Sequence, residues 1–196
     1  MRSLEPSSDP STAPIPVNHA GGASVSATRQ PVVLGLAAVL AVLCVVSYDA
    51  DAHGFISGFT AAVLVVLAAT DLKERLIPNR IVLPATAVVL VAQLAFYSDR
   101  APEWILSALG AAVFLFVPSV IKRGAIGMGD VKLALLLGAS LGYAVLAAMT
   151  IGFVASVPVA LYMLMREGAS ARKKYLPLGP FLAFGTLVVL LSGGAA

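Results

Sequence analysis

The sequence has few residues with which to build a charged surface or a metal site. Only 12% of its residues are charged, and it contains one cysteine and two histidines. A soluble domain has about 25% charged residues, so this chain is too apolar to cover a globular surface. One cysteine excludes a disulfide within the sequence and a cysteine-rich zinc site, and two histidines are too few for a histidine-built metal centre. We therefore expect no metal and no cofactor.

The abundance of apolar residues indicates a different class of protein. Hydrophobic residues make up 59% of the chain, and the mean hydropathy is +0.95. The net charge of +3 is mild, so a nucleic acid is not the expected partner. The composition predicts an all-α, polytopic bundle of membrane helices with lipid around it, located in the inner or plasma membrane.

Residues 1–30 differ from the rest of the chain. They are rich in Ser, Pro, Ala and Gly and lack an apolar period, which is typical of a disordered tail. A secretory signal would place a short basic segment directly before an apolar core of about 7–15 residues. Here a longer apolar run follows about thirty mostly polar residues, so we interpret that run as a retained span rather than a cleaved one. The membrane domain is expected over residues 31–192.

Apolar runs alternate with short charged breaks from residue 31 onward. A bilayer core needs about 20 apolar residues, with a range of about 17–25. The stretch 131–165 is too long for one span and tight for two, but Gly138, Gly142 and Gly152 offer places to turn. About seven spans are predicted, at residues 31–48, 54–70, 80–97, 103–121, 130–142, 143–165 and 178–192.

The distribution of charge predicts the orientation of these spans. Lys and Arg collect in cytoplasmic loops, and seven crossings with a cytoplasmic N-terminus place every basic residue except Arg100 on that side. Four acids then lie in outer loops, where we interpret them as solvated charges: Asp49, Asp51, Asp99 and Glu103. Four aromatic residues fall at the outer edge, as in an aromatic belt: Tyr48, Tyr97, Trp104 and Tyr143.

Two other acids are unusual in their positions. Asp71 ends the second span, where the helix dipole disfavours a negative charge; alternatively, the helix continues and Asp71 pairs with Arg75 four residues on. Asp130 opens the fifth span, where an aspartate is also a favoured N-cap. Because a helical hairpin lies between them, both carboxylates are expected at one depth near the cytoplasmic surface. Two close carboxylates share a proton, as aspartic peptide hydrolysis requires.

Glycines crowd the loop before Asp130. Gly124, Gly127 and Gly129 allow positive φ and close backbone approach, so an extended peptide could lie along them; an ordinary tight turn is the alternative. We expect Gly127, Met128, Gly129 and Lys132 to contact the substrate. Residues 131–142 would span only about 18 Å, so we also expect a water-filled notch around Asp130.

Three segments of the sequence resemble those of type IV prepilin peptidases. They are DLKERLIPN at residues 71–79, GMGDVK at 127–132 and PLGPFLA at 177–183. The resemblance implies an aspartic membrane protease of the GxGD type, with Asp71 and Asp130 as catalytic residues. It implies cleavage of the leader peptide from prepilins or pseudopilins at the cytoplasmic face.

Larger members of that family carry a cytoplasmic cysteine tetrad that binds zinc, and they also methylate the new N-terminus. This chain has only Cys44, inside a span, and so resembles a short, peptidase-only form. Two alternatives remain open at this point. One is a non-catalytic membrane component of a pilus or secretion system, and the other is a small proton-coupled transporter.

Overall fold

The computed structural model describes residues 31–47, 51–74, 77–121, 126–167 and 178–193. Within these ranges all regular elements are helical, which confirms the all-α architecture. The tail 1–30 lies outside the described residues. The described residues form seven α-helices, which follow the predicted apolar runs closely: α1 Pro31–Ser47, α2 Ala52–Glu74, α3 Asn79–Phe96, α4 Ala101–Ile121, α5 Met128–Leu141, α6 Val145–Glu167 and α7 Gly179–Leu191.

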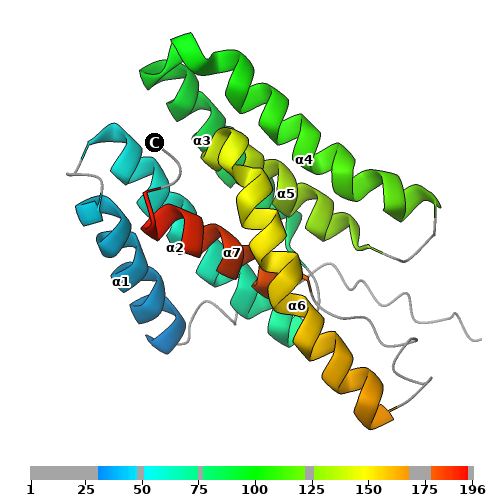
Figure 1. Ribbon diagram of the computed structural model, residues 1–196. Helices are drawn as coiled ribbons and strands as arrows, with labels where there is room; N and C mark the ends of the chain where they lie inside the picture. Colours follow the sequence, from blue (N-terminus) through cyan, green and yellow to red (C-terminus); the bar gives the residue numbers. More distant parts are fainter. Residues whose placement is uncertain (1–30, 48–50, 75–76, 122–125, 168–177, 194–196) are drawn as a thin grey trace, which may run out of the picture.

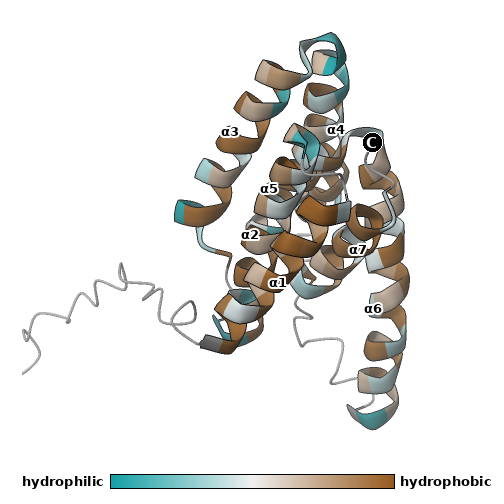
Figure 2. Ribbon diagram, turned by 90° about the vertical axis from the view of Figure 1, so that its left-hand side faces the viewer, coloured by the Kyte–Doolittle hydropathy of each residue, from teal (hydrophilic) through white to brown (hydrophobic). Residues whose placement is uncertain are grey.

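Several of these helices are long and apolar enough to cross a membrane. Within the described ranges four segments qualify by length and composition, and helices α1 and α7 are apolar but shorter. Hydrophobic residues line the helices, and hydrophilic ones collect toward their ends (Figure 2). The chain is therefore a membrane protein, whereas seven crossings and a cytoplasmic N-terminus stay predictions. The four segments are Ala52–Glu74, Asn79–Phe96, Ser98–Ile121 and Met128–Arg166.

Helix α5 lies at the centre of the bundle. It packs along α3 and α4 and also contacts α7, while α1 packs on α2 and α6 packs on α7 (Figure 1). Ten of its 14 residues are buried. At about 1.5 Å per residue this helix is about 21 Å long, which is shorter than a bilayer core of about 30 Å.

Gly138 allows α5 to approach α4 closely. A Cβ atom added there would lie 2.6 Å from the Cα atom of Ala108 and would also meet the backbone carbonyl of Ser107. Small residues at such crossings are typical of membrane helices, where association depends on close packing. Gly138 lies inside α5 and Gly152 inside α6, so neither of these glycines turns the chain as expected.

The turn between α5 and α6 occurs at Gly142. This residue has a φ of 57°, a left-handed conformation that glycine adopts without steric cost. It begins the short 3₁₀-helix η4, Gly142–Ala144, which leads directly into α6. The apolar segment from Met128 to Arg166 thus consists of two α-helices joined by one tight turn.

Glu103 holds this turn in place, and its interpretation as a solvated loop charge was wrong. Its Oε2 accepts a hydrogen bond from Nε of Arg100 at 2.9 Å, and its Oε1 accepts one from the backbone N–H of Tyr143 at 3.3 Å. Arg100 belongs to the 3₁₀-helix η3, Ser98–Arg100, just before α4. Asp51 also has a structural role, because its Oδ1 accepts a hydrogen bond from the N–H of Gly54 at 2.8 Å.

Trp104 was expected in an aromatic belt at the membrane edge, but it is fully buried. Its ring lies 6.2 Å from that of His53, and the ring of His53 lies 5.4 Å from that of Tyr97. The expectation failed because hydropathy places a tryptophan at a helix end without indicating which way the side chain points. We call this part of the bundle, marked by Trp104, His53 and Gly142, the tryptophan end.

Candidate active site

Asp71 lies in the last turn of α2 and is only 3% exposed. The helix continues through Glu74, four residues beyond the predicted end of the span, so Asp71 begins the last turn of α2 instead of ending the helix. The alternative that the helix runs on is therefore correct, while Arg75, its suggested partner, lies outside the described residues. Burial at this position means that the carboxylate faces the bundle and not a solvated loop.

The first residue of α7 closes over Asp71. A Cβ atom added at Gly179 would lie 2.6 Å from Oδ2 of Asp71, so only glycine leaves this space to the carboxylate. The backbone amide of Gly179 is also placed to donate a hydrogen bond to the Asp71 carboxylate. By strict geometry, Oδ2 has no hydrogen-bond partner among the residues that the structure describes. Leu178 is the N-cap of α7 and Pro180 follows Gly179, a position where a proline favours helix initiation.

Asp130 lies in the first turn of α5 and is also 3% exposed. The N-cap of α5 is Gly127, and no side chain caps it. The interpretation of Asp130 as an N-cap is therefore wrong: it is the third residue of the helix. Its position still suits the helix dipole, which favours acids in the first turn.

The two carboxylates are brought together at one end of the bundle. Asp130 is close enough to Asp71 for the two carboxylates to interact electrostatically. The helices that carry them, α2 and α5, contact each other, and both contact α7. We call this part, marked by Asp71, Asp130 and Gly179, the aspartate end. Two neighbouring buried acids can share one proton, which is the arrangement needed for acid–base chemistry on a peptide bond.

Of the glycines before Asp130, Gly129 is required for a close contact, and Gly127 does not have a positive φ. Gly127 has φ −71° and ψ 143°, an extended conformation that any residue can adopt. At Gly129, an added Cβ would lie 2.9 Å from Cβ of Ile77, so this glycine allows the α2–α3 connection to press against α5. Met128, between them, is 55% exposed, while Gly124 lies outside the described residues.

Lys132 reaches toward the start of α3. Its Nζ donates a hydrogen bond to Oδ1 of Asn79 at 2.7 Å. Sequence reasoning did not identify Asn79 or Gly179 as parts of the site, although both lie in the segments that carry the resemblance. The sequence signal for Asn79 is an amide directly after a proline, and the signal for Gly179 is a glycine at the start of a helix. Neither pattern alone indicates which side chain the residue will contact.

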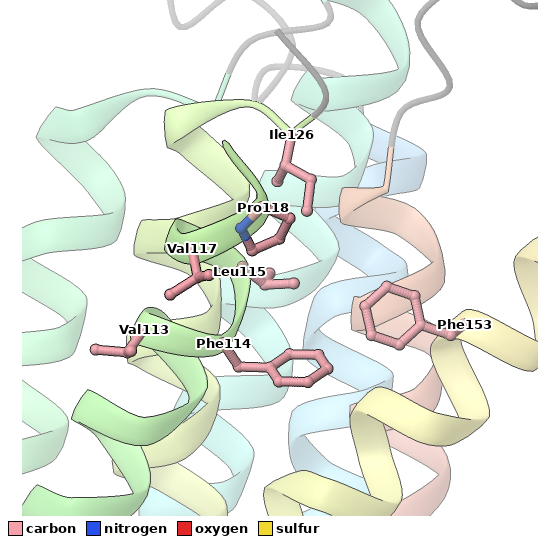
Figure 3. Close-up of a pocket in the computed structure, with 7 residues that line it drawn as sticks. All are labelled: Val113, Phe114, Leu115, Val117, Pro118, Ile126 and Phe153. Carbon is pink, nitrogen blue, oxygen red and sulfur yellow. The ribbon is translucent and has the colours of Figure 1, made fainter. Parts of the chain in front are cut away.

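An apolar groove of about 500 Å³ opens beside this end of the bundle. It lies between α4 and α6, where the rings of Phe114 and Phe153 face each other with centroids 6.3 Å apart (Figure 3). Ile126, which lines it, directly precedes Gly127. The residues that line this groove are all apolar.

No cluster of three or more His, Cys, Asp or Glu side chains occurs within the described ranges. Two carboxylates without a third ligand do not make the closed coordination sphere of a structural metal site.

The sequence matches known proteins over the region that holds both aspartates. Residues 58–164 match the type IV leader peptidase family. A prepilin leader peptidase/N-methyltransferase of Bacillus subtilis is 36% identical over 138 residues, covering 67% of this chain and 53% of that protein. Proteins with the same name from Xanthomonas campestris and Burkholderia pseudomallei are 28% and 35% identical, covering 84% and 68% of this chain and 59% and 47% of their own lengths.

The chain thus spans about half the length of these curated relatives. No solved structure gives a significant match to it. The family match covers more than half of the chain and includes Asp71, Gly129, Asp130 and Lys132. On this basis the chain belongs to the type IV leader peptidase family.

Proposed function

We propose that this protein is a membrane aspartic endopeptidase that removes the leader peptide from type IV prepilins or pseudopilins. The single observation that carries the proposal is the pair of buried carboxylates, Asp71 and Asp130, at one end of an apolar helix bundle. The names of the relatives supply the substrate class. The site acts at the cytoplasmic face of the membrane, to which the basic loops assign the aspartate end.

The two carboxylates divide the chemistry of hydrolysis between them. One is ionised and takes a proton from the attacking water, and the other is protonated and polarises the carbonyl of the scissile bond. The first turn of α5 receives the substrate, with the backbone of Gly127, Met128 and Gly129 alongside the extended peptide. Of these three residues, Met128 has an exposed side chain. Lys132 supports the site through its hydrogen bond to Asn79.

The two alternatives fit these observations less well. A transporter would place its acidic residues near the middle of the bilayer on broken helices, whereas both aspartates lie in terminal turns of unbroken helices. A non-catalytic assembly component would have no need for a buried acidic pair, which is costly in an apolar bundle.

The test is cleavage of a purified type IV prepilin by the purified protein, followed by the mobility of the prepilin on a gel. Asp71→Asn and Asp130→Asn should each lower the rate by about 10²–10⁴-fold, the contribution of one acid–base group. Both variants should retain the thermal unfolding temperature of the wild type in detergent. Cleavage by either variant at near the wild-type rate would exclude the dyad, and inactivity of the wild type would favour the non-catalytic alternative.

A further inference from the structure

The chain at and just before the start of α3 contacts the beginning of α5 at two points. Ile77 packs on Gly129, where an added Cβ would lie 2.9 Å from Cβ of Ile77. Two residues after Ile77, Asn79 accepts a hydrogen bond at its Oδ1 from Nζ of Lys132, at 2.7 Å. We call these four residues the α3–α5 clamp.

The direction of the Lys132 side chain separates the clamp from the reacting groups. An α-helix turns about 100° per residue, so Gly129 and Lys132, three residues apart, lie on the same face of α5. Asp130 and Lys132 are two residues apart and therefore project about 200° from each other. Lys132 faces α3, while Asp130 is buried on the side that meets Asp71.

Helix α3 bridges the two helices that carry the aspartates, as α7 also does. Helices α2 and α5 make few direct contacts, whereas α3 packs along α5 and also against α2. Asp71 precedes Ile77 by only six residues, so the clamp lies close in the chain to the end of α2 that carries Asp71. Association between helices in lipid relies on close packing and on interhelical hydrogen bonds, and the clamp supplies one contact of each kind.

We propose that Asn79 and Lys132 are positioning residues whose hydrogen bond sets the separation of the Asp71 and Asp130 carboxylates. The part of this proposal that concerns cleavage rests on the proposed peptidase function, and the part that concerns the separation rests on the geometry alone. The role also replaces a direct contact between Lys132 and the substrate, because the ammonium is already held by the amide oxygen.

Activity of four variants tests the first part. Lys132→Met and Asn79→Leu remove the hydrogen bond, whereas Lys132→Arg and Asn79→Asp keep a donor and an acceptor in place. The first two should lower kcat for prepilin cleavage by about 10–100-fold, the order of loss caused by a misplacement of about 1 Å, and should leave KM within twofold. The two conservative variants should recover most of kcat.

Arg80→Met is the matched control, because it removes an exposed cation from the residue next to Asn79. It should cleave at the wild-type rate. An unchanged kcat in Lys132→Met would overturn the proposal. A rise in KM alone would also overturn it, because this result would mean that Lys132 contacts the substrate directly.

A distance measurement tests the second part without activity. Spin labels are attached at Lys73→Cys and Met128→Cys, two exposed sites flanking the aspartates, in a Cys44→Ser background reconstituted in bilayers. Lys132→Met should broaden and lengthen the distance distribution, and Lys132→Arg should restore it. An unchanged distribution would overturn the clamp, whereas an inactive wild type with a clamp-dependent distance would reject the proposed function alone.

Discussion

Gly179 and Asp71 fit together so closely that a single added carbon would collide with the carboxylate. A Cβ at Gly179 would lie 2.6 Å from Oδ2 of Asp71. The start of α7 is therefore part of the wall that positions the acid, although its segment lies beyond the residues matched by the family. This contact and others in the bundle give predictions that can be measured.

Gly179→Ala should lower cleavage by about 10–100-fold, because the new methyl group pushes the carboxylate away from Asp130 and small misplacements are costly. The unfolding temperature should change little, since the end of one side chain can rotate aside. Prepilin cleavage and thermal unfolding in detergent measure the two effects. Gly35→Ala is the control, because nothing lies within 4 Å of a Cβ there. Wild-type cleavage by Gly179→Ala would show that α7 does not constrain Asp71.

Gly138→Ala should destabilise the bundle by about 1–3 kcal/mol, the usual cost of overpacking. The added carbon meets backbone atoms of Ser107 and Ala108, which cannot rotate away, so α4 and α5 must separate. Chemical or thermal unfolding in detergent measures the loss. Gly110→Ala has the same gain in helix propensity and open space around its Cβ, so it should be neutral or stabilising. Equal stability of the two variants would contradict the close packing.

Met128→Cys, in a Cys44→Ser background, should react with a membrane-impermeant thiol reagent from the cytoplasmic side. Met128 is 55% exposed at the first turn of α5, where a notch open to water is expected. Addition of a prepilin should slow the reaction, because the substrate lies along this turn in the proposed site. Ala134→Cys is the control, since Ala134 is fully buried in the same helix. An inert Met128→Cys in active enzyme would argue against the notch.

Reporter fusions test the orientation of the bundle. Fusions after Arg80, Arg123 and Lys174 should report a cytoplasmic location, and fusions after Arg100 and Ala196 an external one. The physical reason is the collection of basic residues in alternate loops. A cytoplasmic signal after Ala196 would remove one crossing and would require α7 to enter and leave the membrane on the same side.

The helices were predictable because apolar runs broken by charge indicate spans regardless of what surrounds them. The end of α2 was not, since DLKE is polar but remains helical through Glu74. The roles of Asp71 and Asp130 came from their place in the chain and from the resemblance, and their meeting depends on the hairpin between them. The expected lack of methyl transfer stays a prediction.

Contacts between distant side chains were beyond the sequence. The hydrogen bond between Lys132 and Asn79 joins residues 53 apart, and no local pattern specifies it. Glu103 was interpreted as a loop charge because its partners, Arg100 and Tyr143, come from two different turns. Composition indicates that a charge is near a helix end, but only the tertiary packing decides whether that charge is solvated.

The packing of the tryptophan end has a consequence for where the reaction obtains its protons. Trp104 and Gln93 are fully buried there, and α5 and α6 are joined by a single tight turn at Gly142. In the proposed orientation the aspartates then exchange protons with the cytoplasm alone. In sealed vesicles with the pH set separately on each side, cleavage should follow the pH of the cytoplasmic compartment and ignore that of the other.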